Sequence, residues 1–184
     1  MLLDQKRTKR LVKVAAILTS VAFAGVALVI IAVIVFGGTT SATGQQVSDA
    51  RAQVEEQPDN AAAWDRLAAA YQADGQTEEA LQAARRAVQL SPREYIRTST
   101  LVRLYVESGR PDQAIAVLQQ FTRRNPDDAT AFLQLGRLAQ EDGRIPLARL
   151  SYQAYLRLAP DDVNADAVRQ QLQMLEQGGA PIAP

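Results

Sequence analysis

The sequence contains no cysteine and no histidine among its 184 residues. Without cysteine the chain has no disulfide bond, no thiol nucleophile and no thiolate metal ligand. Without histidine it also lacks the imidazole ligand that zinc sites use and the side chain that most often acts as a general base. We therefore expect no catalytic residue, no metal site and no cofactor, and we predict that the protein is not an enzyme.

Lysine is almost absent as well. It occurs only as Lys6, Lys9 and Lys13, and every basic residue after them is an arginine. The remainder of the chain thus has no lysine for a Schiff base or for a phosphate-binding loop. Residues 1–13 carry a net charge of +4 and the rest carries −4. A mildly acidic body lacks the basic face that nucleic-acid binding requires, so we expect no nucleic-acid partner. No small-molecule substrate is expected either.

No charged residue occurs between Val14 and Ser48, and residues 14–36 are apolar almost throughout. A helix of this length, rising about 1.5 Å per residue, would cross a hydrocarbon core of about 30 Å. The basic residues 1–13 precede this run, which predicts a single-pass inner-membrane protein of a bacterium, with its N-terminus in the cytoplasm. A cleaved signal peptide is the alternative, but its apolar core would span only about 7–15 residues. A bacterial lipoprotein would need a cysteine. Residues 37–45 are typical of a flexible linker.

Two residue types recur with an interval of 34 positions, which indicates stacked helical hairpins. The prolines are Pro58, Pro92, Pro126 and Pro160, and the glycines are Gly75, Gly109 and Gly143. Hairpin stacks of this kind present an extended surface to other chains.

The first period shows how one unit is built. Its first helix carries an apolar stripe at i, i+3, i+4 and i+7, formed by Trp64, Leu67, Ala68 and Tyr71. A glycine then stops the helix, and the second helix carries small residues at Ala80, Ala84 and Ala87 before Pro92 ends the unit. This pattern resembles the tetratricopeptide repeat. The resemblance implies an all-α, TPR-type α-solenoid, and the transmembrane helix predicted from residues 14–36 would precede it.

The register defines the domain organisation. A TPR domain is expected at residues 46–177, before a disordered tail at 178–184. Its parts are a leading half repeat (46–60), three repeats (61–94, 95–128 and 129–162) and a capping helix (163–177). Asn60, Asp128 and Asp162 each precede an expected helix and are predicted to cap it.

The second and third units depart from the family pattern. Thr98 replaces the large aromatic residue and Phe121 a small alanine in the second unit, while Ala139 replaces the tyrosine and Tyr155 an alanine in the third. Each loss of a large side chain accompanies a gain, so we expect core volume to be conserved.

The resemblance also implies that the first helix of each unit lines a peptide-binding groove. The polar groove candidates are Asp65, Gln72, Ser99, Arg103, Thr130, Arg137 and Gln140. Apolar residues at such positions include Ile96, Val106 and Leu133. Arg103 and Arg137 occupy equivalent positions and should stand side by side, where two guanidinium groups would suit a carboxylate. Alternatively, each pairs with the glutamate four residues later, Glu107 or Glu141.

These observations favour a non-catalytic adaptor or scaffold. It would be tethered to the membrane with its repeats on the extracytoplasmic side, bind protein or peptide segments in the groove, and assist envelope protein assembly or translocation. The alternative is a structural membrane subunit that associates with itself, with Phe121 and Tyr155 forming an adhesive patch if they are exposed.

Overall fold

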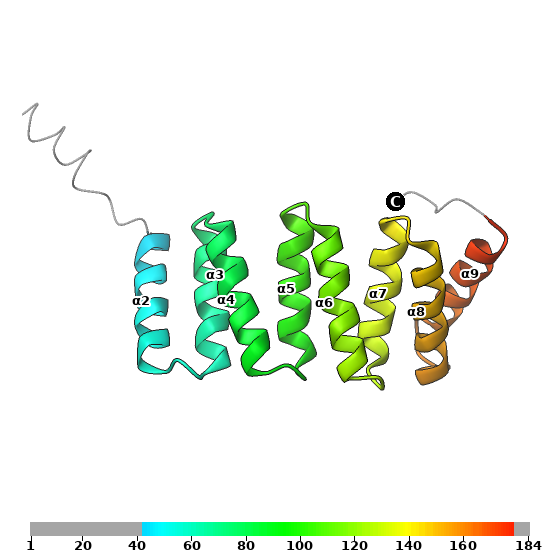
Figure 1. Cartoon of the computed structure of the whole chain (residues 1–184), viewed down its shortest axis with the longest axis horizontal. Coiled ribbons are helices and arrows are strands. Elements are labelled where there is room, and N and C mark those ends of the chain that lie inside the picture. Colours follow the sequence, from blue (N-terminus) through cyan, green and yellow to red (C-terminus); the bar gives the residue numbers. More distant parts are fainter. Residues whose placement is uncertain (1–41, 179–184) are drawn as a thin grey trace, which may run out of the picture. The chain divides into compact units, whose positions relative to one another are not determined.

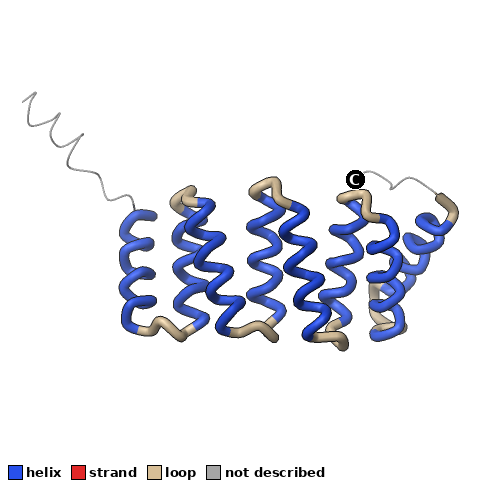
Figure 2. Tube along the Cα trace, in the orientation of Figure 1, coloured by secondary structure: helices blue, strands red, loops and turns tan. Residues whose placement is uncertain are grey.

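The computed structural model describes residues 42–178, and this segment contains eight α-helices and no strand (Figures 1 and 2). Within this segment, residues 46–178 form one compact unit. The helices are α2 (Ala42–Glu56), α3 (Ala61–Ala73), α4 (Thr77–Leu90), α5 (Tyr95–Glu107), α6 (Pro111–Arg124), α7 (Ala129–Glu141), α8 (Ile145–Leu158) and α9 (Ala165–Glu176).

Six of these helices form three antiparallel hairpins, α3–α4, α5–α6 and α7–α8, in the predicted register. Within each hairpin the turn contains a glycine with a left-handed backbone, at φ values of 75°, 72° and 75° for Gly75, Gly109 and Gly143. In the first turn Gly75 N donates to the carbonyl of Gln72 at 3.1 Å, and Gln76 N donates to that of Tyr71 at 2.9 Å. This pair of bonds is the Schellman motif, so glycine sets where the first helix of each unit stops.

Side-chain caps start two of the three first helices as predicted for Asn60 and Asp128. Asn60 Oδ1 accepts from Ala62 N at 3.0 Å, and Asp128 Oδ1 accepts from Ala131 N at 2.9 Å. The prediction for Asp162 is wrong, because α9 begins at Ala165 and its N-cap residue is Asn164. Asp162 instead accepts a 2.5 Å hydrogen bond from the Tyr155 hydroxyl and orders the intervening turn.

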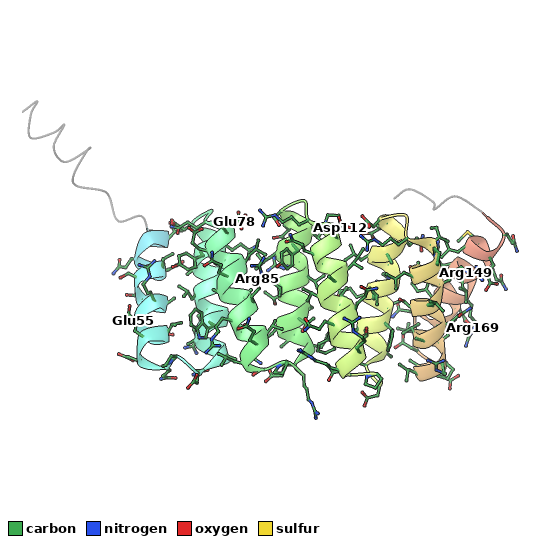
Figure 3. All side chains as sticks on the ribbon, in the orientation of Figure 1. Glu55, Glu78, Arg85, Asp112, Arg149 and Arg169 are labelled. Atoms are coloured by element: carbon green, nitrogen blue, oxygen red, sulfur yellow. The ribbon has the colours of Figure 1, made fainter. Side chains whose placement is uncertain are left out.

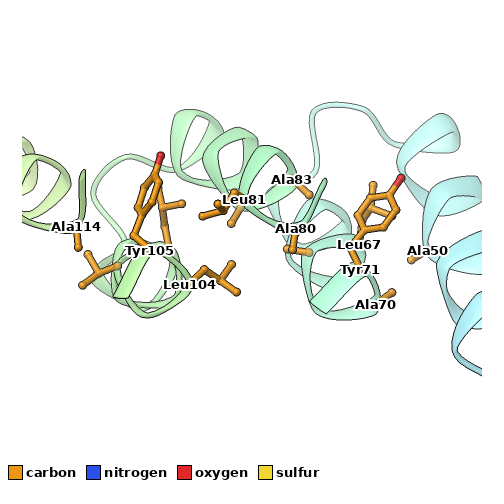
Figure 4. Packing of buried hydrophobic residues seen from close by; sticks show 14 of the residues in the cluster. Ala50, Leu67, Ala70, Tyr71, Ala80, Leu81, Ala83, Leu104, Tyr105 and Ala114 are labelled. Atoms are coloured by element: carbon orange, nitrogen blue, oxygen red, sulfur yellow. The ribbon is translucent and has the colours of Figure 1, made fainter. Parts of the chain in front are cut away.

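The buried side chains run through the stack between neighbouring helices. Small residues such as Ala80, Ala84 and Ala114, each at most 2% exposed, allow close helix contact. Larger side chains fill the remaining space, and Figure 4 shows Tyr71 and Tyr105 in two such positions 34 residues apart. One core therefore runs from α2 through the first two hairpins to Leu135 and Leu138 of α7, and a second core fills the space between α7, α8 and α9.

Helix α2 has the role of a second helix in an incomplete leading unit. Val47, Ala50 and Val54 are buried in the same core as the first hairpin. The helix starts at Ala42, so residues 42–45, expected in the linker, are helical instead. At the other end, α9 buries Ala165, Val168 and Leu175 and exposes its remaining side.

The substituted core positions behave as expected in part. Thr98 and Phe121 are 1% and 3% exposed and line the same pocket, while Ala139 and Tyr155 are also buried. A pocket of about 230 Å³ lies beside Thr98, and one of about 200 Å³ lies beside Phe132 at the equivalent place in the third unit. Phe121 and Tyr155 are both buried, so the condition for an adhesive patch of these two residues is not met.

Within the described range 42–178, no helix is both long and apolar enough to span a membrane. The predicted basic segment 1–13, membrane helix 14–36, most of the linker and nearly all of the tail lie outside the described residues.

Candidate functional site

A groove of about 620 Å³ lies between the first helices of the second and third units. We call it the α5–α7 groove. Helix α5 contributes Ile96, Ser99, Thr100, Val102, Arg103, Val106 and Glu107, and α7 contributes Gln134, Arg137, Leu138 and Glu141. The 34-residue period places these residues in register, so the groove follows directly from the repeat.

Its apolar part is unusually accessible. Ile96 is 69% exposed and Val106 is 43% exposed, one near each end of α5. By contrast Leu133, predicted to face the groove, is buried in the core around α8 and α9. Two branched side chains therefore remain available to a partner along α5.

Arg103 is held by a hydrogen-bonded network. Its Nη1 donates to Glu107 Oε1 at 2.7 Å and its Nη2 to Gln72 Oε1 at 3.2 Å. Gln72 Nε2 in turn donates to Glu107 Oε2 at 2.8 Å. The charge of Arg103 is thus compensated, as the i,i+4 alternative predicted, and α3 is linked to α5 at the edge of the groove.

Arg137 differs from Arg103 although it occupies the equivalent position. Within residues 42–178 it makes no side-chain hydrogen bond or ion pair, and the same holds for Glu141. The predicted i,i+4 pair therefore forms in α5 and does not form in α7. Both arginines line one groove, but Arg137 presents the open guanidinium group.

The remaining groove candidates mostly serve neighbouring helices. Asp65 lies 2.9 Å from Nε of Arg97, which also pairs with Glu94. Gln140 accepts a 2.9 Å hydrogen bond from the Tyr152 hydroxyl, and the Ser99 hydroxyl donates to the Ile96 carbonyl at 2.9 Å. Thr130 is exposed but outside the groove lining. Of the seven candidates, Ser99, Arg103 and Arg137 meet in this groove.

Two further sets of contacts between units were missed in the sequence. Arg51 donates to the Tyr71 hydroxyl at 2.8 Å and Arg85 to that of Tyr105 at 2.5 Å, and each guanidinium group lies over the same ring. Both arginines and both tyrosines are 34 residues apart. At the next joint, Gln119 of the second unit and Ala139 of the third unit take these places, so both members of the pair are absent.

The second set connects the turn inside one unit with the start of the second helix in the preceding unit. Arg110 pairs with Glu78, and Arg144 with Asp112, in both cases across 32 residues. The hydrogen bond from Arg110 lowers the pKa of Glu78. Glu78 and Asp112 lie toward the same end of the helices in Figure 3. This constant spacing of arginine and acid was the available signal in the sequence.

No cluster of carboxylates in the described segment could hold a metal ion. Burial raises the pKa of Tyr95 and of Tyr152 to about 12, and the nearby Arg137 partly offsets this rise. These phenols stay protonated near neutral pH and act as hydrogen-bond donors to Gln134 and Gln140.

Two profiles described as tetratricopeptide repeat match the sequence, one at residues 61–94 and the other at residues 99–163. Together they cover more than half of the chain. This chain is a tetratricopeptide repeat protein. A search of characterised protein sequences finds no match.

Solved structures with the repeat fold agree with this assignment. A crystal structure of MamA is 18% identical, with a TM-score of 0.57 over 72% of this chain and 75% of that one. A tetratricopeptide repeat protein from Parabacteroides merdae is also 18% identical, with a TM-score of 0.59 over 72% of this chain and 53% of its own. The first TPR of Spaghetti (RPAP3), bound to HSP90 peptide SRMEEVD, is 15% identical, with a TM-score of 0.50 over 64% of this chain and 91% of that one. At these identities the likeness concerns the fold.

Proposed function

We propose that this chain is a scaffold that holds an extended protein segment in the α5–α7 groove. The repeat fold is suited to protein–protein interaction, and one structural relative is bound to a peptide. The observation that carries the proposal is the open charge of Arg137 in a groove that also exposes Ile96 and Val106.

The groove favours a particular kind of segment. A carboxylate on the partner would pair with Arg137, a cation would suit Glu141, and an apolar side chain would cover Ile96 or Val106. Arg103 contributes less, because Glu107 and Gln72 already satisfy it. The partner is thus a segment of mixed charge with one large apolar residue, rather than a strongly acidic one.

Photocrosslinking tests this binding. A photoreactive residue at position 103 or 137 should give protein adducts in cells, whereas the same residue at Gln153, exposed on α8, should not. Adding R137Q to a variant with the photoreactive residue at position 103 should reduce the adducts about fivefold or more if the charge contributes about 1 kcal/mol. Equal adducts from position 153, or none from either groove position, would count against the groove.

We also propose that residues 14–36 anchor the chain in a bacterial inner membrane with the repeats outside, where they assist envelope protein assembly or translocation. The support is the uncharged run and the basic segment before it. Because the chain has no cysteine, a single cysteine introduced at Gln113 can be labelled cleanly in whole cells. We expect a maleimide that cannot cross membranes to label this cysteine. If the cysteine were labelled only after lysis, the repeats would lie on the cytoplasmic side instead.

Self-association gives a different outcome in the same crosslinking experiment. Adducts with twice the mass of the chain, from positions 103 and 137 alike, would indicate that copies of this protein occupy the groove. The predicted patch for such association is buried, so we expect heterologous adducts.

A further inference from the structure

A second pocket lies on the other side of α5 from the groove. The two have no lining residue in common. The pocket opens between the second helices α4 and α6 and has a volume of about 230 Å³. Val88, Leu101, Val117 and Phe121 supply its apolar lining. We call it the Thr98 pocket, because Thr98 is its most buried polar member at 1% exposure.

The lining of the pocket differs from that of the other units at position 98. Thr98 occupies the position that holds Trp64 in the first unit and Phe132 in the third. Phe121 enters the same space from α6, where its ring lies 5.7 Å from that of Tyr95. The equivalent place beside Phe132 in the third unit also has a pocket, of about 200 Å³, so what distinguishes the pocket in the second unit is the hydroxyl of Thr98 in place of an aromatic ring.

The Thr98 hydroxyl has no hydrogen-bond partner within the described protein. Thr122, also buried in a helix, shows the usual arrangement, since its hydroxyl donates to the Leu118 carbonyl at 3.0 Å. A buried hydroxyl without a partner is unfavourable by itself. A group that enters the pocket with a hydrogen-bond donor would remove this penalty.

The charged residues of the lining all have one sign. Arg85 and Arg124 are exposed at the pocket, and none of its lining residues is acidic. Arg85 uses Nε to donate to Tyr105, and Arg124 makes no side-chain pair within residues 42–178. Carboxylates placed beside the entering ring would therefore find two guanidinium groups.

We propose that the Thr98 pocket binds a tryptophan or tyrosine side chain from an acidic segment of a partner protein. The ring packs against Val88, Leu101 and Val117, its N–H or O–H donates to the Thr98 hydroxyl, and flanking carboxylates pair with Arg85 and Arg124. This docking site is independent of the α5–α7 groove, and both can be occupied together.

Methyl NMR of the full chain in detergent micelles tests the proposal with blocked tripeptides as probes. Acetyl-Asp-Trp-Glu-amide should shift the methyl signals of Val88, Leu101 and Val117 in a saturable way. Acetyl-Lys-Trp-Lys-amide has the opposite charge and acetyl-Asp-Ala-Glu-amide lacks the ring, so neither peptide should shift these signals. R124Q should weaken binding about two- to fivefold, as for one solvated ion pair.

Two variants at position 98 separate the roles of space and hydroxyl. T98W fills the pocket and should abolish the shifts. T98V keeps the shape of the side chain but lacks the hydroxyl. One hydrogen bond to this hydroxyl should make the tryptophan peptide bind about two- to tenfold more tightly than the same peptide with naphthylalanine, and T98V should remove this preference. Shifts confined to Ile96 and Val106 would place the peptide in the α5–α7 groove and overturn this proposal while supporting the other. Unchanged binding in T98V and R124Q would also overturn it.

Discussion

Replacing Thr98 by valine should stabilise the repeat domain. Valine has the shape of threonine without the hydroxyl, and the two residues have similar helix propensities. The substitution removes a buried hydroxyl that has no partner in the described protein. Most substitutions of buried residues have the opposite effect, so the sign alone is informative.

The magnitude follows from the environment of the hydroxyl. An unsatisfied buried hydroxyl costs about 1–3 kcal/mol, so the free energy of unfolding should rise by about 1–2 kcal/mol in T98V. A domain of this size should gain about 3–5 °C in Tm for each kcal/mol. The matched control is T122V, because the hydroxyl of Thr122 is satisfied by the Leu118 carbonyl. We expect T122V to be neutral or destabilising by up to about 1 kcal/mol.

Urea unfolding followed by circular dichroism measures both variants. The midpoint should increase for T98V and not for T122V, while the slope of the transition stays the same in both. The reasoning would be refuted by a T98V midpoint equal to or below that of the parent. It would equally fail if T122V stabilised the chain as much as T98V.

Three further results are expected. Gly109→Ala should lower the free energy of unfolding by about 1–2 kcal/mol, because alanine disfavours the left-handed backbone there. Gly136→Ala should lower it more, because a Cβ there would lie 2.6 Å from the Tyr152 ring. Equal losses in urea unfolding would contradict this. Stability should fall as pH rises from about 10 to 12, because the folded state favours the protonated form of Tyr152, whose pKa is about 12. Y152F should reduce this fall by up to about 2.7 kcal/mol, and an unchanged slope would exclude that cause. Tyr105→Phe should lower the free energy of unfolding by about 1 kcal/mol, and it should have no such effect in a chain that already carries Arg85→Met. The same loss in both backgrounds would show that the hydrogen bond between the two side chains contributes nothing.

The repeat register was predictable because it depends on residues whose backbone preferences act locally. A glycine after each first helix and a proline at each unit end fix the turns within a few residues, and the structure places helices in those intervals. The apolar stripe of the first unit likewise follows from helical geometry. Local conformational preferences therefore sufficed for the fold and for the helices that line the groove.

The chemistry of the groove was less predictable because it depends on pairs far apart in the sequence. Arg103 and Arg137 share a register position, yet Arg103 is fixed by Gln72 from the previous unit, 31 residues away. The third unit has no counterpart of that contact for Arg137 in the described structure, because Gln140 bonds to Tyr152 and the α5 residue equivalent to Gln72 is Val106. Equivalent positions thus differ through their neighbours, which a single repeat pattern does not specify.

Asp162 illustrates the same limit at a helix end. An acidic residue after a unit-ending proline caps the next helix at Asp128 but not at Asp162. The difference arises from Tyr155, whose hydroxyl holds Asp162 in the turn. The large side chain that replaced a small one in the third unit thereby also changed the start of α9.

The helices in the described segment pack mainly on their neighbours in chain order, and this gives the stack a defined mechanical response. A load applied along the row passes through every joint in turn, so the joint with the fewest links would open first. The joint between the second and third units lacks the arginine–tyrosine link present at the two earlier joints. Opening one unit of 34 residues would release about 120 Å of extended chain, so the row could lengthen stepwise under tension while the other units stayed folded.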